Sequence, residues 1–451
     1  MARDLTIGKP YQVILKFCGP ILLGNLLQQI YNITDTVIVG QFVGINALAG
    51  VGSTSSLTFL ILGFVMGTST GFSIPISRCF GAKNYQGLKK YFTNAIYFAV
   101  FIAVILTFLT LFFMNDILTI MNTQSDVFSY AKTYISTIFA GMVGTFLYNF
   151  FAASLRAIGD SKTPLLFLMI TAVLNIILDL IFVLGLGLGV FGTGLATIIS
   201  QAVSATMCII FINKKITYLQ TKKEDWQFNI KTIGELFRVG VPMGLQFSIA
   251  AIGAVILQSA VNTLGTTYVA AIAAGSRISY FAMNALDTLG LTMATFTGQN
   301  IGAGKLDRLN QGVRHALLIG IIYSISMFIL LFFFGKYIIL IFVNASETEV
   351  IANTMKFLLI DSSGYIICTF LHVFRNTVQG SGYSAVAMFA GVMEMIARIF
   401  VATVLITAFG YNGAIFSNPT AWFAAVLFLV PTYLVIIKKL KKKQAEKLAQ
   451  A

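Results

Sequence analysis

Residues 18–40 read CGPILLGNLLQQIYNITDTVIVG. The run has the length of a membrane-spanning helix, which needs about 20 apolar residues, yet it contains a proline and one aspartate, Asp35. A carboxylate inside a bilayer costs at least a few kcal/mol, so Asp35 indicates an ion or substrate pathway. The structural alternative is that a hydrogen bond to Asn32 or Thr36 holds Asp35 neutral.

The rest of the chain is as apolar as this run. It has 451 residues, of which 57% are hydrophobic and only 10% charged, whereas soluble proteins have about 25% charged residues. We count twelve apolar runs of membrane length, and none alternates with the period of two that β-barrel strands require. The prediction is an all-α integral membrane protein with spans near 12–40, 51–77, 91–114, 130–154, 164–186, 191–213, 240–264, 268–299, 315–334, 350–378, 385–408 and 413–437.

The net charge of +14 is distributed unevenly. One alternating set of connections, with both termini, holds 25 of the 30 Lys and Arg residues, and we place Arg375 in this set. The opposite set holds Lys132, Lys336 and Lys356. By the positive-inside rule both termini are cytoplasmic, in a multi-pass protein of the inner (cytoplasmic) membrane. The charge therefore reflects topology and does not indicate nucleic-acid binding.

The sequence repeats itself at a spacing of roughly 220 residues. FCGPILLG matches VGVPMGLQ, which places Pro20 opposite Pro242, and SLRAIGDS matches TVQGSGYS. Each half has six spans, so the repeat is parallel, with a pseudo-two-fold axis along the membrane normal; such repeats are typical of transporters, with substrate bound between them. The predicted domains are an N-terminal six-helix lobe (1–213), a cytoplasmic linker (214–239), a C-terminal six-helix lobe (240–437) and a basic cytoplasmic tail (438–451).

Four polar residues of the N-terminal half share one depth in the membrane. Asp35 and Asp179 each lie six residues before the outer end of their span, roughly 9 Å below the outer surface, and Thr197 lies at a similar depth. Asn175 is one helical turn from Asp179. If their faces converge, these side chains form a hard-oxygen site suited to Na⁺, or a carboxylate pair that holds a proton.

The repeat provides an internal comparison for these positions. Asn175 falls opposite Arg398 and Asp179 opposite Ala402, while Asp35 falls opposite Leu257 or Gln258. The C-terminal half therefore has no counterpart of this group of polar residues. Since both halves are expected to have the same fold, the fold alone does not require the group.

The remaining intramembrane charges allow more than one interpretation. Glu394 and Arg398 are spaced i,i+4 and can neutralise each other. Asp287 and Asp361 have no partner on their own helix, so each either attracts a cationic substrate into a central cavity or caps a helix break. His372, alone in an apolar span, is most often a hydrogen-bonded structural residue.

The chain resembles the multidrug and toxic compound extrusion (MATE) family over essentially its whole length. The resemblance rests on Pro20 with the DTVIVG segment, the SRxxGA junction (77–82), the GQNxGAG junction (298–304) and the LNIILD segment. It implies two six-helix bundles that alternate between outward-open and inward-open states. It also implies export of lipophilic or cationic compounds such as drugs against an inward flow of H⁺ or Na⁺.

The resemblance also implies roles for individual residues. Asp35, Asn175, Asp179 and Thr197 match the N-lobe cation site of the DinF-like branch, and Pro20 matches the hinge of the first helix. Ala250 and Cys368 stand where the NorM-like branch has acidic residues, so coupling is expected through the N-lobe. We expect a monomer without enzymatic activity and with no cofactor other than the coupling ion, Na⁺ or H⁺.

Three other functions are alternatives to drug export. A lipid-linked sugar or lipid flippase of the same broader superfamily is expected to have a strongly cationic cavity and often extra spans. A membrane enzyme such as an acyltransferase needs a nucleophile, a base and an orienting group at one depth, and the chain has only two histidines, His315 and His372. A channel needs a filter-like re-entrant segment, which the repeat does not contain.

Overall fold

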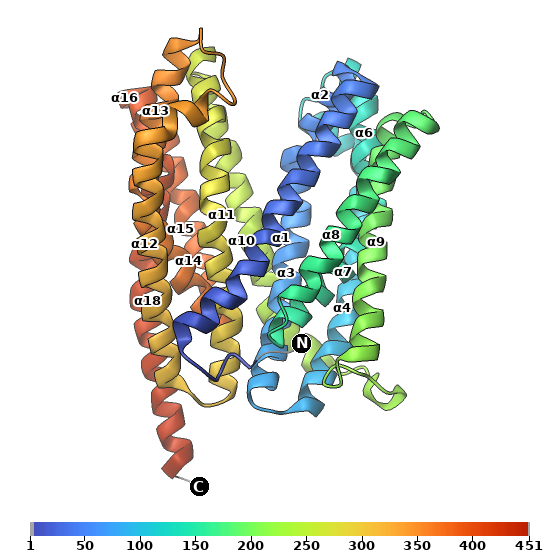
Figure 1. Ribbon diagram of the computed structural model, residues 1–451, viewed down its shortest axis with the longest axis vertical. Coiled ribbons are helices and arrows are strands. Elements are labelled where there is room, and N and C mark those ends of the chain that lie inside the picture. The colour runs from blue at the N-terminus through green and yellow to red at the C-terminus, as the bar shows by residue number, and fades with distance from the viewer. Residues whose placement is uncertain (1–3, 450–451) are drawn as a thin grey trace. The chain divides into compact units, whose positions relative to one another are not determined.

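The computed structural model describes residues 4–449, so the first three residues of the predicted N-terminal lobe, Arg3 among them, and the last two of the predicted tail lie outside the described residues. The described chain folds into helices, most of them connected by short turns, with a longer connection at 216–229 (Figure 1). The α-helices are α1 (Pro10–Ile38), α2 (Ile45–Ser53), α3 (Ser55–Gly81), α4 (Tyr85–Phe112), α5 (Met114–Ile120), α6 (Ser125–Ala140), α7 (Met142–Ala157), α8 (Lys162–Asp179), α9 (Gly189–Lys215), α10 (Ile230–Asn262), α11 (Thr266–Gly302), α12 (Leu306–Ile339), α13 (Thr348–Ser363), α14 (Tyr365–Gly380), α15 (Ser384–Phe400), α16 (Ile406–Phe409), α17 (Tyr411–Ala414) and α18 (Ser417–Ala449). Three π-helical segments, η1 (Val39–Val43), η2 (Leu180–Gly185) and η4 (Val401–Leu405), follow α1, α8 and α15, and a 3₁₀ turn, η3 (Lys223–Asp225), lies before α10.

The helices agree with the predicted membrane spans. Nine helical stretches between residues 4 and 449 are long and apolar enough to cross a bilayer. Two bent pairs, α6 with α7 (51°) and α13 with α14 (46°), bring the number to 11 if each pair is one span. The twelfth predicted span, 268–299, lies in α11. The second half of α11 buries several threonine and amide side chains, which lower its hydropathy, so it is not among the helical stretches counted above. The prediction of an all-α, multi-pass membrane protein is confirmed.

The chain forms two compact units whose boundaries fall inside two helices. Unit 1 contains Gly19–Gly244, and unit 2 contains Leu5–Cys18 together with the chain from Leu245 onward. The chain thus changes unit within α1, next to Pro20, and within α10, close to Pro242. In these two places the units differ from the predicted lobes, since the predicted linker belongs to unit 1 and the first turns of α1 belong to unit 2.

The core of unit 1 is rich in aromatic side chains. α3 packs on α4 and α7, while α9 packs on α7 and α8 (Figure 1). Phe72 of α3 stacks on Phe98 of α4 with 5.3 Å between ring centroids, and Phe92 stacks on Phe150 of α7 at 5.6 Å. These fully or nearly buried rings fix α3, α4 and α7 as the frame of the unit.

The first turns of α10 pack against α3 through glycines. A Cβ atom on Gly71 would lie 2.5 Å from Gly240 Cα and 3.0 Å from Val239 O, so the two backbones are in direct contact. Small residues permit this close approach of helices in membrane proteins. The segment that follows the predicted linker is therefore an integral part of unit 1.

We expect Gly71→Ala to destabilise the protein by about 1–3 kcal/mol, because the added methyl group meets backbone that must move. Gly234→Ala, in an exposed turn of α10 with no atom within 4 Å, is the matched control and should be neutral or stabilising by up to about 1 kcal/mol. The measurement is thermal unfolding of the purified protein in detergent. Equal effects of the two substitutions would contradict the close contact.

In unit 2, α11 packs against α12, α13 and α14, and α18 packs against α14 and α15. The N-terminal segment is bound to this unit by polar contacts. The Leu5 amide donates to Gln299 Oε1 (2.9 Å), and Lys305 Nζ donates to the Thr6 carbonyl (2.9 Å). Phe17 of α1 is buried in the same unit.

Candidate functional site

The structure brings Asp35 and Asp179 together within unit 1. Asp35 lies in the last turn of α1 and Asp179 is the last residue of α8. The two carboxyl groups interact with each other. Apart from this contact, one oxygen of Asp35 and both oxygens of Asp179 are buried without a hydrogen-bond partner among the described residues. Two carboxylates in such a place repel each other unless a proton or a cation lies with them.

The structural alternative for Asp35 involves Asn32 and Thr36. The Thr36 hydroxyl donates to the Asn32 carbonyl (2.8 Å), which is an ordinary intrahelical bond. The side chain of Asn32 lies on an exposed face of α1. The neighbour of Asp35 is therefore the carboxyl group of Asp179 on another helix.

A π-helical segment follows each of these carboxylates. The η1 segment begins four residues after Asp35, and η2 begins immediately after Asp179. π-Helical turns are rare and are frequently found at functional sites, because the wider turn changes the direction of side chains and leaves backbone groups less regularly paired. The local backbone is thus irregular at the level where the two carboxylates meet.

Polar side chains of two further helices complete the surroundings. Tyr134 of α6 lies within electrostatic range of both Asp35 and Asp179. Asn175, one turn before Asp179, is 2% exposed, and neither atom of its amide has a hydrogen-bond partner in residues 4–449. Thr197 of α9 donates its hydroxyl to the Thr193 carbonyl (3.0 Å), which leaves its oxygen lone pairs available.

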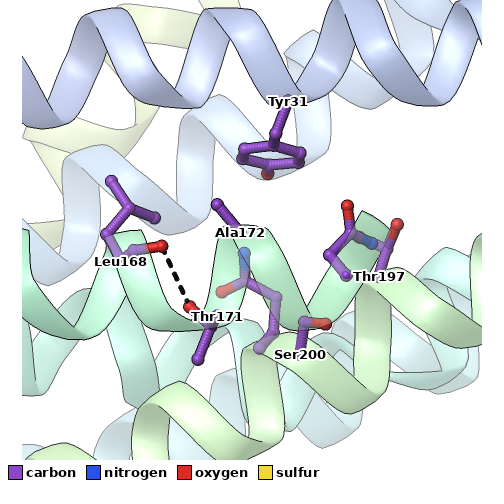
Figure 2. A pocket seen from close by; sticks show the side chains of 8 residues that line it. Tyr31, Leu168, Thr171, Ala172, Thr197 and Ser200 are labelled. Atoms are coloured by element: carbon purple, nitrogen blue, oxygen red, sulfur yellow. Dashed lines mark hydrogen bonds between the residues drawn. The ribbon is translucent and has the colours of Figure 1, made fainter. Parts of the chain in front are cut away.

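A small pocket opens beside Asn175, between α1, α8 and α9 (Figure 2). Its cavity volume is about 10 Å³, and Figure 2 shows the Tyr31 ring pointing from α1 toward the residues of the other two helices. The pocket is lined by Tyr31, Leu168, Thr171, Ala172, Asn175, Thr197, Ser200 and Gln201. Two of the predicted site residues, Asn175 and Thr197, therefore face the same pocket.

Sequence reasoning missed Tyr31, Ser200 and Gln201. Tyr31 is one helical turn before Asp35 and interacts with both Asp35 and Gln201. The Ser200 hydroxyl and the Gln201 side-chain oxygen are buried without a partner among the described residues. A search for polar residues at i−4 of Asp35 and i+4 of Thr197 could have found Tyr31 and Gln201.

The donor set suits a small cation or a proton. Among residues 4–449 no three His, Cys, Asp or Glu side chains are grouped so that they could hold a metal ion. The group around Asp35 and Asp179 instead combines two carboxylates with amide and hydroxyl oxygens, which are the ligands that hard cations take. The buried oxygens without partners fit such an occupant.

Asp287 lies in unit 2, and its side chain is half exposed (49%). Its Oδ1 is 3.5 Å from Nδ1 of His372 on α14, and the guanidinium of Arg375 lies within electrostatic range. Asp287 thus has neighbours on another helix and still presents part of its carboxyl group at a surface. Its predicted role in a substrate cavity stays a prediction.

Asp361 is buried in unit 2. It lies in α13, two residues before this helix ends at Ser363, and Asn418 of α18 donates to its Oδ1 (2.9 Å). The bend between α13 and α14 follows directly. This position favours the second alternative considered for Asp361, a polar residue at a helix break, over a place in the cavity.

The prediction that Arg375 lies in a loop is wrong. Arg375 is in α14, is buried, and donates a hydrogen bond to Glu394 of α15. The predicted pairing of Glu394 with Arg398 is confirmed, with 3.8 Å between Oε2 and Nη2. A guanidinium group can stay inside the helix bundle because the carboxylate of a neighbouring helix neutralises it.

The two halves also match a known family. A family model described as MatE matches residues 20–181 and again residues 242–404. The chain belongs to the MatE family. The two matches of this MatE model start at Pro20 and Pro242, which confirms the predicted internal repeat.

Relatives of this MatE protein are named as multidrug resistance or export proteins. It is 30% identical to the probable multidrug resistance protein YoeA of Bacillus subtilis (strain 168) over 373 residues, which are 81% of this chain and 80% of that protein. It is 24% identical to the multidrug export protein MepA of Staphylococcus aureus (strain MSSA476) over 417 residues, 90% of each protein. A solved structure of an outward-facing multidrug resistance MATE family transporter of the MOP superfamily covers 97% of this chain and 98% of its own, with a TM-score of 0.90 at 21% identity.

Proposed function

We propose that this MatE protein is an antiporter that exports lipophilic or cationic organic compounds across the cytoplasmic membrane and is driven by H⁺ or Na⁺. The observation that carries the proposal is the Asp35–Asp179 pair, in which three carboxyl oxygens are buried without a hydrogen-bond partner among the described residues beyond the pair itself. Such a pair changes its charge when it takes up a cation, and a change of buried charge can bias a conformational equilibrium. The names of the relatives support drugs as the class of substrate.

The coupling is expected to act through unit 1, as in the DinF-like branch. Asp35 lies on α1, the helix that carries Pro20 and changes unit beside it. Binding of H⁺ or Na⁺ between Asp35 and Asp179 would favour one bend of α1 at Pro20. Substrate and cation that prefer different bends would each displace the other, which is the thermodynamic condition for antiport.

The test is transport by the purified full-length protein in proteoliposomes, with a fluorescent lipophilic cation as substrate. A Na⁺ gradient and a pH gradient are imposed separately. We expect one of them to drive dye movement, and that one identifies the coupling ion. Failure of both gradients to move any cationic dye would contradict the proposal and favour the lipid or lipid-linked sugar flippase.

Pro20→Ala is expected to reduce gradient-driven export by about tenfold, within the usual range of coupling energies. Proline removes one intrahelical hydrogen bond and favours a kink, whereas alanine favours a straight helix by about 3 kcal/mol. The variant should therefore fold and be at least as thermostable as the wild type. Pro431→Ala, a helix-internal proline on an exposed face of α18, is the matched control and should export normally. Unchanged export by Pro20→Ala would exclude Pro20 as the hinge.

A further inference from the structure

Four charged side chains of unit 2 follow one another in a chain of alternating sign. Arg375 and Glu394 are buried, Arg398 is 13% exposed and Asp287 is half exposed. Asp287 of α11 lies within electrostatic range of Arg375 of α14, Arg375 donates to Glu394 of α15, and Glu394 contacts Arg398 one turn further along α15. With His372 neutral, the formal charges of Asp287, Arg375, Glu394 and Arg398 sum to zero. Arg398 ends this chain, and its Nη1 is buried without a partner in the described part of the protein.

The repeat places this chain where unit 1 has its polar pocket. The GDS motif before α8 (159–161) matches GYS at the start of α15 (382–384), so Thr171 falls opposite Glu394 and Asn175 opposite Arg398. Both α8 and α15 continue into a π-helical segment, which supports the alignment of these two helices. Thr171 and Asn175 line the pocket of unit 1, and their counterparts are an ion pair.

The first helix of each half differs in a complementary way. Pro20 matches Pro242, so Tyr31 of α1 falls opposite Gly253 of α10. A Cβ atom on Gly253 would lie 3.5 Å from Arg398 Cδ and 3.3 Å from Met395 Cα. The side chain of a tyrosine would therefore overlap the stem of Arg398. Unit 1 has an aromatic ring and an open polar pocket, whereas unit 2 has a glycine and the arginine that passes beside it.

We propose that the Arg398 guanidinium is a tethered cation that permanently fills, in unit 2, the cation position whose counterpart in unit 1 is open to exchange. The comparison with unit 1 rests on the proposed function. The place that Arg398 occupies in unit 2 is formed by Glu394, Gly253 and the neighbouring charges of Arg375 and Asp287. Unit 2 keeps its cation whatever the ion gradient is. Only the first helix of unit 1 then responds to the coupling ion, while α10 is held in one state.

The proposal predicts a latent cation site in Arg398→Ala. Removal of the side chain leaves a formal charge of −1 and a space with the shape of a guanidinium group, because Asp287 and Glu394 then face only Arg375. We expect the variant to lose thermal stability and about tenfold or more of its export rate. Millimolar guanidinium should restore much of both, whereas the wild type, whose site is filled, should not respond.

The experiment uses purified full-length protein, by thermal unfolding in detergent and by dye export in proteoliposomes. Urea, which has the shape of guanidinium without its charge, is the matched additive, and potassium chloride keeps the ionic strength constant. Arg314→Ala, an exposed arginine of α12, is the matched variant and should show no response. Arg398→Lys should retain most of the function, since its ammonium group supplies the charge.

Equal effects of guanidinium and urea on Arg398→Ala would overturn the proposal, as would wild-type behaviour of this variant without any additive. If Arg398→Ala does not fold, the charge-balanced variant Glu394→Gln/Arg398→Met decides. It should fold and be indifferent to guanidinium, and a selective guanidinium response or a failure to fold would count against the tethered cation. The rescue by guanidinium is measured with Asp35 and Asp179 unchanged. Its outcome in thermal unfolding therefore does not depend on whether Asp35→Asn abolishes export.

Discussion

Asp35→Asn is expected to reduce gradient-driven export by about 100-fold, in the upper part of the range of coupling energies. The amide has nearly the shape of the carboxylate but cannot change its charge when a cation arrives. Its substitution therefore removes the difference between the loaded and unloaded states of the Asp35–Asp179 pair. The measurement is dye export from proteoliposomes under the gradient that drives the wild type.

Asp179→Asn should have the same effect as Asp35→Asn, and the double variant should be no worse than either single one, because the two carboxylates act as a unit. Binding of the dye itself should survive in both. Asp126→Asn, an exposed aspartate in the first turn of α6, controls for the loss of one negative charge and should export normally. Full export by both site variants would exclude the pair as the coupling site.

Glu394→Ala is expected to lower the free energy of unfolding by about 3–5 kcal/mol, the cost of leaving a buried charge without its partner. Two guanidinium groups, those of Arg375 and Arg398, depend on this one carboxylate. Thermal unfolding of the purified protein in detergent should show a large decrease in the transition temperature.

Two further variants separate charge from packing at Glu394. Glu394→Gln keeps the shape and part of the hydrogen bonding, so its loss of stability should be smaller than that of the alanine variant. Glu349→Ala, an exposed residue in the first turn of α13, should cost less than about 1 kcal/mol. If Glu394→Ala is as stable as this control, the ionic chain does not stabilise unit 2.

The common depth of Asp35 and Asp179 in the membrane could be predicted from the sequence, because it depends only on residue counts and on helix geometry. Each residue lies a countable number of helical steps from the end of its span, and the rise per residue is fixed. Rotation about the helix axis decides whether two residues at one depth meet. The π-helical segments change that rotation beside the site, so the meeting of the carboxylates and the part played by Tyr31 required the structure.

Arg375 shows why a count of charges fails inside a helix bundle. Hydropathy treats each residue alone, and an arginine near the end of an apolar run is therefore assigned to the nearest loop. Its carboxylate partner, Glu394, is 19 residues away on another helix. Only tertiary structure brings the two together, and the same holds for Asp361, whose partner Asn418 is 57 residues away.

The exchange of helix segments between the units limits how this protein can be divided. Residues 5–18 belong to unit 2, although they precede nearly all of unit 1 in the chain, and the first turns of α10 belong to unit 1. A cut near residue 220 would give two fragments, each of which carries a piece of the other's core and lacks a piece of its own. Neither fragment should be stable alone, and the two should assemble only as partners, as the subunits of a domain-swapped dimer do. A six-helix chain with the same crossover would need a second copy of itself to complete its core; in this protein both halves lie on one chain, which makes that mutual dependence permanent.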